Sequence, residues 1–126
     1  MKEHVTWEQV ETFVEFVASY IEKNEIEISG VYGIPRGGLV FAVMLSHRLR
    51  IPMLASATDD CLVVDDICDS GESLVHFVKN TSNPDKQKPL TATMYYKENK
   101  LGVEPDIYKY VKTDQWIVFP FEHDEK

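Results

Sequence analysis

The fold of this chain is decided by Cys61-Leu62-Val63-Val64-Asp65-Asp66-Ile67-Cys68-Asp69-Ser70-Gly71-Glu72-Ser73-Leu74. The first four residues are apolar and run directly into two adjacent carboxylates, those of Asp65 and Asp66. A continuous apolar run that ends at a turn is typical of a strand buried on both faces, as in a parallel α/β sheet. Ligands of such sheets bind outside the carboxyl ends of the strands. We therefore expect both carboxylates at a binding site.

The residues after this strand form a turn that suits an anion. Asp69-Ser70-Gly71-Glu72-Ser73 combines small side chains with the backbone N–H groups of a helix start, and such a turn can cradle a phosphate. Carboxylates beside a phosphate cradle indicate a sugar phosphate, because its hydroxyls need acceptors and its phosphate needs donors. The alternative is a strand that ends in a solvated acidic turn, with Ser or Asp as a helix N-cap.

A second loop, from Tyr32 to Leu39, places Arg36, Gly37 and Gly38 between an expected strand and an expected helix. Glycines allow the backbone to approach a ligand closely, and Arg36 can offer a fork of donors to phosphate oxygens. The alternative is an ordinary strand-to-helix turn with an exposed arginine.

Strands and helices alternate along the chain. Thr6-Trp7-Glu8-Gln9 is a capping box that opens a helix, and the apolar residues that follow predict one buried stripe: Val10, Phe13, Val14, Val17, Tyr20 and Ile21. A helix expected to be well buried begins at Gly37-Gly38, and a third begins at Glu72. Strands are expected at residues 28–34, 51–54, 62–65, 90–97 and 116–119. This order predicts an α/β fold with a parallel sheet flanked by helices, in one domain over residues 1–126.

The acidic pair, the third aspartate, Ser70-Gly71 and Ser73 together resemble the signature of the type I phosphoribosyltransferases, which bind 5-phosphoribosyl-1-pyrophosphate. The resemblance implies that Asp65 and Asp66 hold the ribose hydroxyls, directly or through Mg²⁺, and that the turn from Asp69 to Ser73 wraps the 5′-phosphate. The implied site for this substrate comprises Arg36, Gly37, Gly38, Asp65, Asp66, Asp69, Ser70, Gly71, Glu72 and Ser73, with Asp66 and Asp65 as metal ligands.

The loop at Arg36 resembles the pyrophosphate loop of the purine enzymes of this family, and the match continues through Leu49-Arg50-Ile51-Pro52. In that family the loop carries a cis peptide bond, which would fall between Pro35 and Arg36 here. The resemblance implies that Arg36 and the amides of Gly37 and Gly38 hold the pyrophosphate.

Lys97 ends an expected strand, and Trp116-Ile117 lies in a short expected strand near the C-terminus. The pair resembles the base-binding end of the 6-oxopurine branch, which includes hypoxanthine, guanine and xanthine enzymes. The resemblance implies a small C-terminal hood in which Lys97 donates to O6 of the base, Trp116 stacks on the purine, and backbone groups at Ile117 read its C2 edge. Taken singly, a solvated lysine and a core tryptophan are the alternatives. Asp69 would lie near N7 and accept the proton that leaves as N9 attacks the sugar.

One family element is missing. Enzymes of this family carry a long mobile flap between the strands that correspond to residues 51–54 and 62–65, whereas only Ala55-Ser56-Ala57-Thr58-Asp59-Asp60 stands there in this chain. Six residues make a turn or a tight hairpin, and closing lids exclude water from reactions of this kind. We expect slow catalysis, or a cover from a partner subunit.

Charge and composition restrict the partners. A net charge of −8 argues against binding nucleic acid through a basic face. No apolar run approaches the ~20 residues that span a bilayer, and Met1-Lys2-Glu3-His4 lacks the apolar core of a signal peptide. Cys61 and Cys68 are expected as reduced thiols, so we expect a cytoplasmic protein. Analogy with type I relatives predicts a homodimer.

The leading hypothesis is a Mg²⁺-dependent purine phosphoribosyltransferase that joins a 6-oxopurine base to the ribose carbon of phosphoribosyl pyrophosphate and releases pyrophosphate. Asp69 and Arg36 would be its catalytic residues. The alternative is a non-catalytic sensor of a nucleotide or of phosphoribosyl pyrophosphate with the same fold. A weaker third hypothesis is a metal cluster for phosphate hydrolysis, formed by Asp59, Asp60, Asp65, Asp66 and Asp69.

Overall fold

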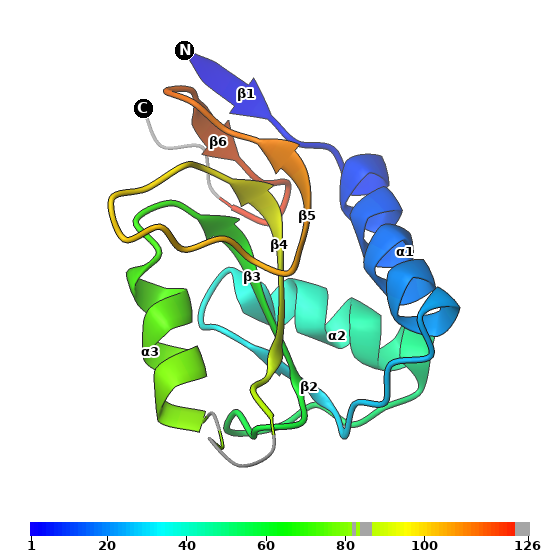
Figure 1. Ribbon diagram of the computed structural model, residues 1–126. Helices are drawn as coiled ribbons and strands as arrows, with labels where there is room; N and C mark the ends of the chain where they lie inside the picture. Colours follow the sequence, from blue (N-terminus) through cyan, green and yellow to red (C-terminus); the bar gives the residue numbers. More distant parts are fainter. Residues whose placement is uncertain (82, 84–86, 123–126) are drawn as a thin grey trace.

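The computed structural model describes residues 1–81, 83 and 87–122. Its main sheet has four parallel strands in the spatial order β2-β3-β4-β5. Helices α1 (Trp7–Lys23) and α2 (Gly38–Leu49) cover one face, and α3 (Glu72–Thr81) covers the other (Figure 1). The strands are β2 (Val31–Gly33), β3 (Leu62–Cys68), β4 (Leu90–Tyr96) and β5 (Ile107–Val111). The predicted α/β fold with a flanked parallel sheet is confirmed.

Strand β3 is buried on both faces, as its apolar run predicts. Leu62 and Val64 pack into the large core under α1 and α2, whereas Val63 packs with Leu74 in a smaller cluster under α3. Alternate side chains of a strand point to opposite faces of the sheet, so this three-residue run contributes to both layers. The central position of β3 places the residues that follow it in the middle of the upper edge of the sheet in Figure 1.

Helix α1 begins with the predicted capping box. The Thr6 hydroxyl accepts a hydrogen bond from the N–H of Gln9 at 3.1 Å, and the Gln9 side chain accepts one from the N–H of Thr6 at 2.9 Å. The expected stripe is buried except for Tyr20, which is exposed, and Ala18 belongs to the buried face instead. The prediction for Tyr20 was therefore wrong, because this ring lies on the solvent side of the helix.

Helix α2 is apolar all round, but only one of its faces is buried. Phe41, Ala42 and Leu45 are fully buried, whereas Leu39 and Val43 are 40% and 43% exposed. The expectation of a well-buried helix was therefore wrong for one face, because α1, β2 and β3, which pack on α2, leave Leu39 and Val43 exposed.

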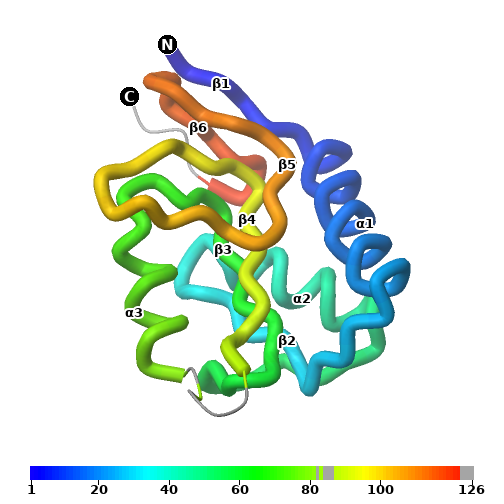
Figure 2. The backbone as a smooth tube through the Cα atoms, in the orientation of Figure 1, coloured from blue at the N-terminus to red at the C-terminus, as the bar shows by residue number. Residues whose placement is uncertain are grey.

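A second, two-stranded parallel sheet lies above the carboxyl ends of the main strands. It pairs β1 (Lys2–His4) with β6 (Trp116–Val118), so that the two ends of the chain run side by side (Figure 2). The sequence predicted β6 as part of a C-terminal hood. It did not predict β1, because Lys2-Glu3-His4 is polar and owes its extended conformation to backbone pairing.

The segment expected as a strand at residues 51–54 forms only a single bridge, between Met53 and Val31. The N–H of Val31 donates to the carbonyl of Pro52 at 3.0 Å, and the N–H of Leu54 donates to the carbonyl of Val31 at 2.9 Å. The pairing stays this short because the chain turns away after Leu54, and Pro52 has no N–H to add to a ladder.

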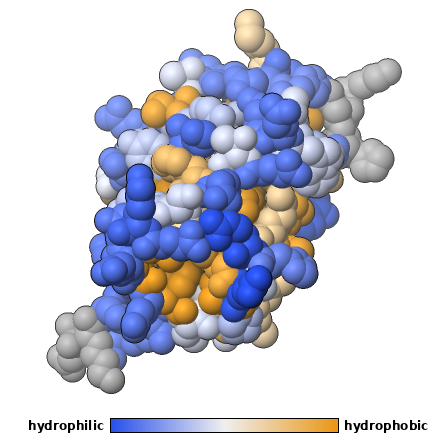
Figure 3. Space-filling model, turned by 90° about the vertical axis from the view of Figure 1, so that its right-hand side faces the viewer, coloured by the Kyte–Doolittle hydropathy of each residue, from blue (hydrophilic) through white to orange (hydrophobic). Residues whose placement is uncertain are grey.

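The surface on the α1 side is mostly hydrophilic, with an apolar area in its lower half (Figure 3). A groove of about 870 Å³ at the C-terminal end of α1 is lined by Ile21, Glu22, Glu25, Ile26, Glu27, Ile28, Leu49 and Ile51. Within the described residues, no helix has both the length and the apolar character needed to span a bilayer.

Candidate active site

The acidic pair lies where β3 extends past its neighbour β2. The last paired residues of these strands are Gly33 and Val64, so Asp65 and Asp66 come directly after the end of β2 and remain beside β4. An oxygen of Asp65 accepts a hydrogen bond from the N–H of Asp66, and an oxygen of Asp66 accepts one from the N–H of Ile67, both at 2.8 Å. Burial, followed by the adjacent charge of Asp66, raises the pKa of Asp65 to about 8. The pair is an acidic site that would accept a cation.

The loop between β2 and α2 is held against this pair. The N–H of Gly38 donates to the carbonyl of Ile34 at 2.9 Å, and a cis peptide bond joins Pro35 to Arg36. A Cβ atom on Gly37 would overlap the carboxylate of Asp66. The first turn of α2 carries no acidic residue of its own, but the Asp66 carboxylate lies against its start, and the N–H of Leu39 donates to the carbonyl of Arg36 at 3.2 Å. Arg36 is exposed.

The turn from Asp69 to Ser73 encloses a small hollow at the start of α3. The hollow has a volume of about 120 Å³ and is lined by Asp65, Ile67, Cys68, Asp69, Ser70, Gly71, Ser73 and Leu74. Gly71 has a φ of +85°, which a glycine adopts without strain. The N–H of Glu72 donates to the hydroxyl of Ser70 at 3.3 Å. This hollow lies beside Asp65, at the turn where the sequence motif predicts a phosphate cradle, and the binding of a phosphate there stays a prediction.

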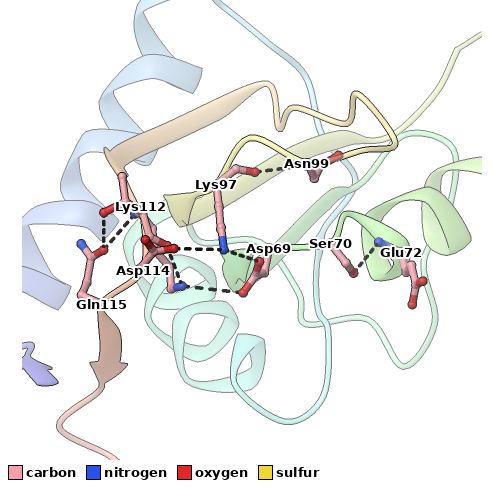
Figure 4. Close-up of polar contacts among 9 residues, drawn as sticks. Asp69, Ser70, Glu72, Lys97, Asn99, Lys112, Asp114 and Gln115 are labelled. Carbon is pink, nitrogen blue, oxygen red and sulfur yellow. Dashed lines mark hydrogen bonds and ion pairs between the residues drawn. The ribbon is translucent and has the colours of Figure 1, made fainter. Parts of the chain in front are cut away.

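Asp69 also connects the turn to the next strand (Figure 4). The ammonium of Lys97, which follows β4, is 4.0 Å from Oδ1 of Asp69 and 4.0 Å from Oδ1 of Asp114. The N–H of Lys97 donates to the carbonyl of Cys68 at 2.8 Å, so the two chain segments are held together by backbone as well. Lys97 and Asp69 therefore lie in one cluster at the carboxyl ends of β3 and β4.

The hood places Trp116 and Ile117 differently. Trp116 is 70% exposed, whereas the side chain of Ile117 is buried in the main core. The N–H of Trp116 donates to the carbonyl of Met1 at 2.9 Å. Trp116 is therefore not a core tryptophan, and its ring is available to a ligand. It comes two residues after Asp114, whose carboxylate contacts Lys97.

A second lysine belongs to this cluster and was missed in the sequence. The ammonium of Lys112 is 3.7 Å from Oδ2 of Asp69, although its side chain is only 10% exposed. Lys112 directly follows β5, a strand that was also missed. The sequence did carry a signal for strand β5, because Ile107-Tyr108-Lys109-Tyr110-Val111 is rich in the aromatic and β-branched residues that favour strands.

A metal site would have to be shared with a substrate. Within residues 1–81, 83 and 87–122 no group of three or more His, Cys, Asp or Glu side chains converges as a metal site. The five aspartates of the hydrolase hypothesis therefore do not gather into one cluster. Asp65 and Asp66 offer the hard carboxylate oxygens that Mg²⁺ binds, and this ion usually completes its shell with waters and substrate phosphates. The pair fits a shared Mg²⁺ site of that kind.

The short connection in place of the flap lies at the opposite end of the sheet. The hydroxyl of Ser29 donates to Oδ1 of Asp60 at 2.7 Å, and the N–H of Ser29 donates to the carbonyl of Asp60 at 3.0 Å. Both residues precede their strands, β2 and β3, whose first residues pair with each other. The segment from Ala55 to Asp60 therefore lies at the amino ends of the strands, far from the carboxylates, and cannot cover them.

No protein-family model and no curated protein sequence matches the chain. Solved structures do match it. A purine phosphoribosyltransferase from Pyrococcus horikoshii Ot3 is 27% identical, with a TM-score of 0.80 over 99% of this chain and 97% of that chain. A xanthine-guanine-hypoxanthine phosphoribosyltransferase from Helicobacter pylori is 22% identical, with a TM-score of 0.79 over 94% and 92% of the two chains. A hypothetical protein from Neisseria gonorrhoeae, solved with bound ppGpp, is 19% identical, with a TM-score of 0.75 over 99% and 92%.

These likenesses and the arrangement of the loops define the class of the protein. The chain has the type I phosphoribosyltransferase fold, without the flap, and its structural neighbours include hypoxanthine, guanine and xanthine phosphoribosyltransferases.

Proposed function

We propose that this protein transfers the 5-phosphoribosyl group from phosphoribosyl pyrophosphate to a 6-oxopurine base and releases pyrophosphate. The observation that carries the proposal is the position of Asp69. Asp69 is the first residue of the turn that would hold the phosphate, and its carboxylate also lies beside the ammonium of Lys97. A base held by Lys97 would therefore stand next to a ribose 5-phosphate held by the turn. Purine phosphoribosyltransferases among the structural neighbours support the same activity.

In this proposal the two loops and the acidic pair hold the phosphoribosyl donor. Arg36 and the amide of Gly37 bind the pyrophosphate, and the N–H of Gly38 joins them by leaving the carbonyl of Ile34. The amides from Ser70 to Ser73 bind the 5′-phosphate. Asp65 and Asp66 accept hydrogen bonds from the ribose hydroxyls and are the residues that would hold Mg²⁺. When bound, Mg²⁺ would neutralise charge that develops on the departing pyrophosphate.

The base would be held at the other end of the site. Lys97 donates to O6, the exposed ring of Trp116 stacks on the purine, and the backbone at Ile117 faces the C2 edge. N9 of the base uses its lone pair to attack the ribose C1′, and the bond from C1′ to the pyrophosphate oxygen breaks, with its electrons leaving on the pyrophosphate. The proton on N7 passes to Asp69, which restores a neutral purine ring.

A non-catalytic sensor remains as a second candidate because the flap is absent. A site that stays open to water can bind a nucleotide but protects the reacting carbon poorly. One experiment separates the two functions. The protein is incubated with phosphoribosyl pyrophosphate, Mg²⁺ and each purine base in turn, and nucleoside monophosphate is measured by chromatography. The transferase forms it with oxopurines, whereas the sensor binds nucleoside monophosphates in calorimetry and forms none.

We further propose that the protein is a homodimer, as its type I resemblance predicts. Leu39 and Val43, four residues apart on α2, and Met53 beside the edge of β2 are all exposed. Leu39 and Val43 share one face of α2 because they are four residues apart, and exposed apolar side chains that share a face often mark an interface. Sedimentation velocity checks this, and a monomer at all concentrations would contradict it.

A further inference from the structure

Asp69 is approached by two lysines, one on each of its oxygens. Lys97 lies 4.0 Å from Oδ1, and Lys112 lies 3.7 Å from Oδ2 (Figure 4). The proposed function assigns Lys97 to the base, but it gives Lys112 no role. The ammonium of Lys112 nevertheless reaches the same carboxylate from a different strand.

The two lysines are held in different ways. Lys112 is fixed by its backbone N–H, which donates to the carbonyl of Tyr96 at 2.8 Å, and its ammonium donates to the carbonyl of Thr113 at 3.3 Å. Its side chain is 10% exposed, against 35% for Lys97. Lys97 is shared between Asp69 and the fully exposed Asp114. We therefore infer that the side chain of Lys97 can turn toward a ligand, whereas the ammonium of Lys112 stays in contact with Oδ2 of Asp69.

We propose that Lys112 is a positioning residue, which holds the carboxylate of Asp69 in place while Lys97 turns to the base. This inference rests on the proposed function. When a 6-oxopurine binds, its O6 replaces a carboxylate as the partner of Lys97. Lys112 remains on Oδ2, so that Oδ1 faces the N7 proton. Without Lys112, the half-exposed side chain of Asp69 would be free to leave that orientation whenever Lys97 is engaged.

The test is a double-mutant cycle. Lys112→Met keeps the length of the side chain and removes its charge, and it is made in the wild type and in Asp69→Asn. Misplacing a reacting group by about 1 Å can cost ~10²-fold in rate. We expect Lys112→Met to lower kcat by ~10- to 100-fold with the KM for phosphoribosyl pyrophosphate unchanged, and Lys112→Arg to restore part of it. In Asp69→Asn, the same substitution should change nothing further, because residues that act as a unit are not additive.

Lys109 provides a matched control, because it lies in β5 three residues before Lys112. Its ammonium lies over the ring of Phe16, 4.7 Å from the ring centroid, on the α1 side of the sheet. Lys109→Met should leave kcat unchanged. Thermal unfolding establishes that each variant is folded, and Lys112→Gln replaces Lys112→Met if the latter does not fold.

Three results would overturn the inference. The first is an equal loss from Lys112→Met with and without Asp69. The second is a change in the KM for the base with kcat unchanged, which would make Lys112 a base contact. The third is a wild type that turns over no purine, which refutes the proposed function itself and is recognised without any variant.

Discussion

The carboxylate of Asp66 occupies the space in which a side chain on Gly37 would lie. Gly37 lies between β2 and α2, whereas Asp66 lies in β3, and the two residues are well separated in the sequence. Their contact joins the proposed pyrophosphate loop to the proposed ribose and metal site. A single ligand can therefore contact both residues, and a substitution at Gly37 must displace the carboxylate of Asp66.

Gly37→Ala should weaken the binding of phosphoribosyl pyrophosphate in the presence of Mg²⁺. The new methyl group displaces the Asp66 carboxylate, and overpacking of this kind costs about 1–3 kcal/mol. We expect a loss of ~10-fold or more in affinity, measured by titration calorimetry. The control is the same substitution in Asp66→Ala, where the space is free and Gly37→Ala should have little further effect. Unchanged affinity in the single variant would show that the contact is not used in binding.

Asp69→Asn should lose most of its turnover and keep most of its affinity for phosphoribosyl pyrophosphate. The substitution preserves the shape of the side chain but removes the proton acceptor, and groups of this kind contribute ~10²–10⁴-fold. Steady-state kinetics with each oxopurine provides kcat, and calorimetry provides the affinity. If turnover were unchanged, the N7 proton would leave by another route.

Gly71→Ala should damage the phosphate cradle. Gly71 has a φ of +85°, and a Cβ there would approach the side chain of Val103 to 2.8 Å. Gly102→Ala is the matched control, because Gly102 has a φ of +67° and nothing within 4 Å of its Cβ position. Both variants should lose about 1 kcal/mol or more of stability, but only Gly71→Ala should weaken the binding of inorganic phosphate measured by calorimetry. Equal phosphate affinity in both would contradict the cradle.

Asp65→Asn should stabilise the protein at pH 8 more than at pH 5, with EDTA present. Burial and the charge of Asp66 raise the pKa of Asp65 to about 8 in the folded state, from about 3.9 in the unfolded chain. Between these values the folded state binds a proton that the unfolded state lacks, so stability falls as pH rises toward 8. The substitution removes this dependence. Urea unfolding of the wild type and of Asp65→Asn at pH 5 and pH 8 measures the free energy of unfolding of each protein. If the two proteins differed by the same free energy at both pH values, Asp65 would be ionised in the folded state at both.

The sequence was most informative where local chemistry fixes local structure. The apolar run at Leu62–Val64 and the turn at Asp69–Ser73 each carry their own signal, so strand, turn and helix α3 were all predicted. Long-range pairing carried no such signal. Lys112 could not be assigned, because only the ladder from β3 to β5 brings it to Asp69. The exposure of Leu39 and Val43 depends on which elements pack on α2, which periodicity alone does not state.

In the proposed function, an open site without a flap still transfers the phosphoribosyl group to an oxopurine. The most direct measurement follows nucleoside monophosphate and pyrophosphate together in one reaction, with Mg²⁺, phosphoribosyl pyrophosphate and a saturating oxopurine. We predict that the nucleotide forms, and that pyrophosphate exceeds it because water reaches the same ribosyl carbon. Equal amounts at high turnover would mean that a neighbouring subunit closes the site. No nucleotide with hypoxanthine, guanine or xanthine would contradict the account.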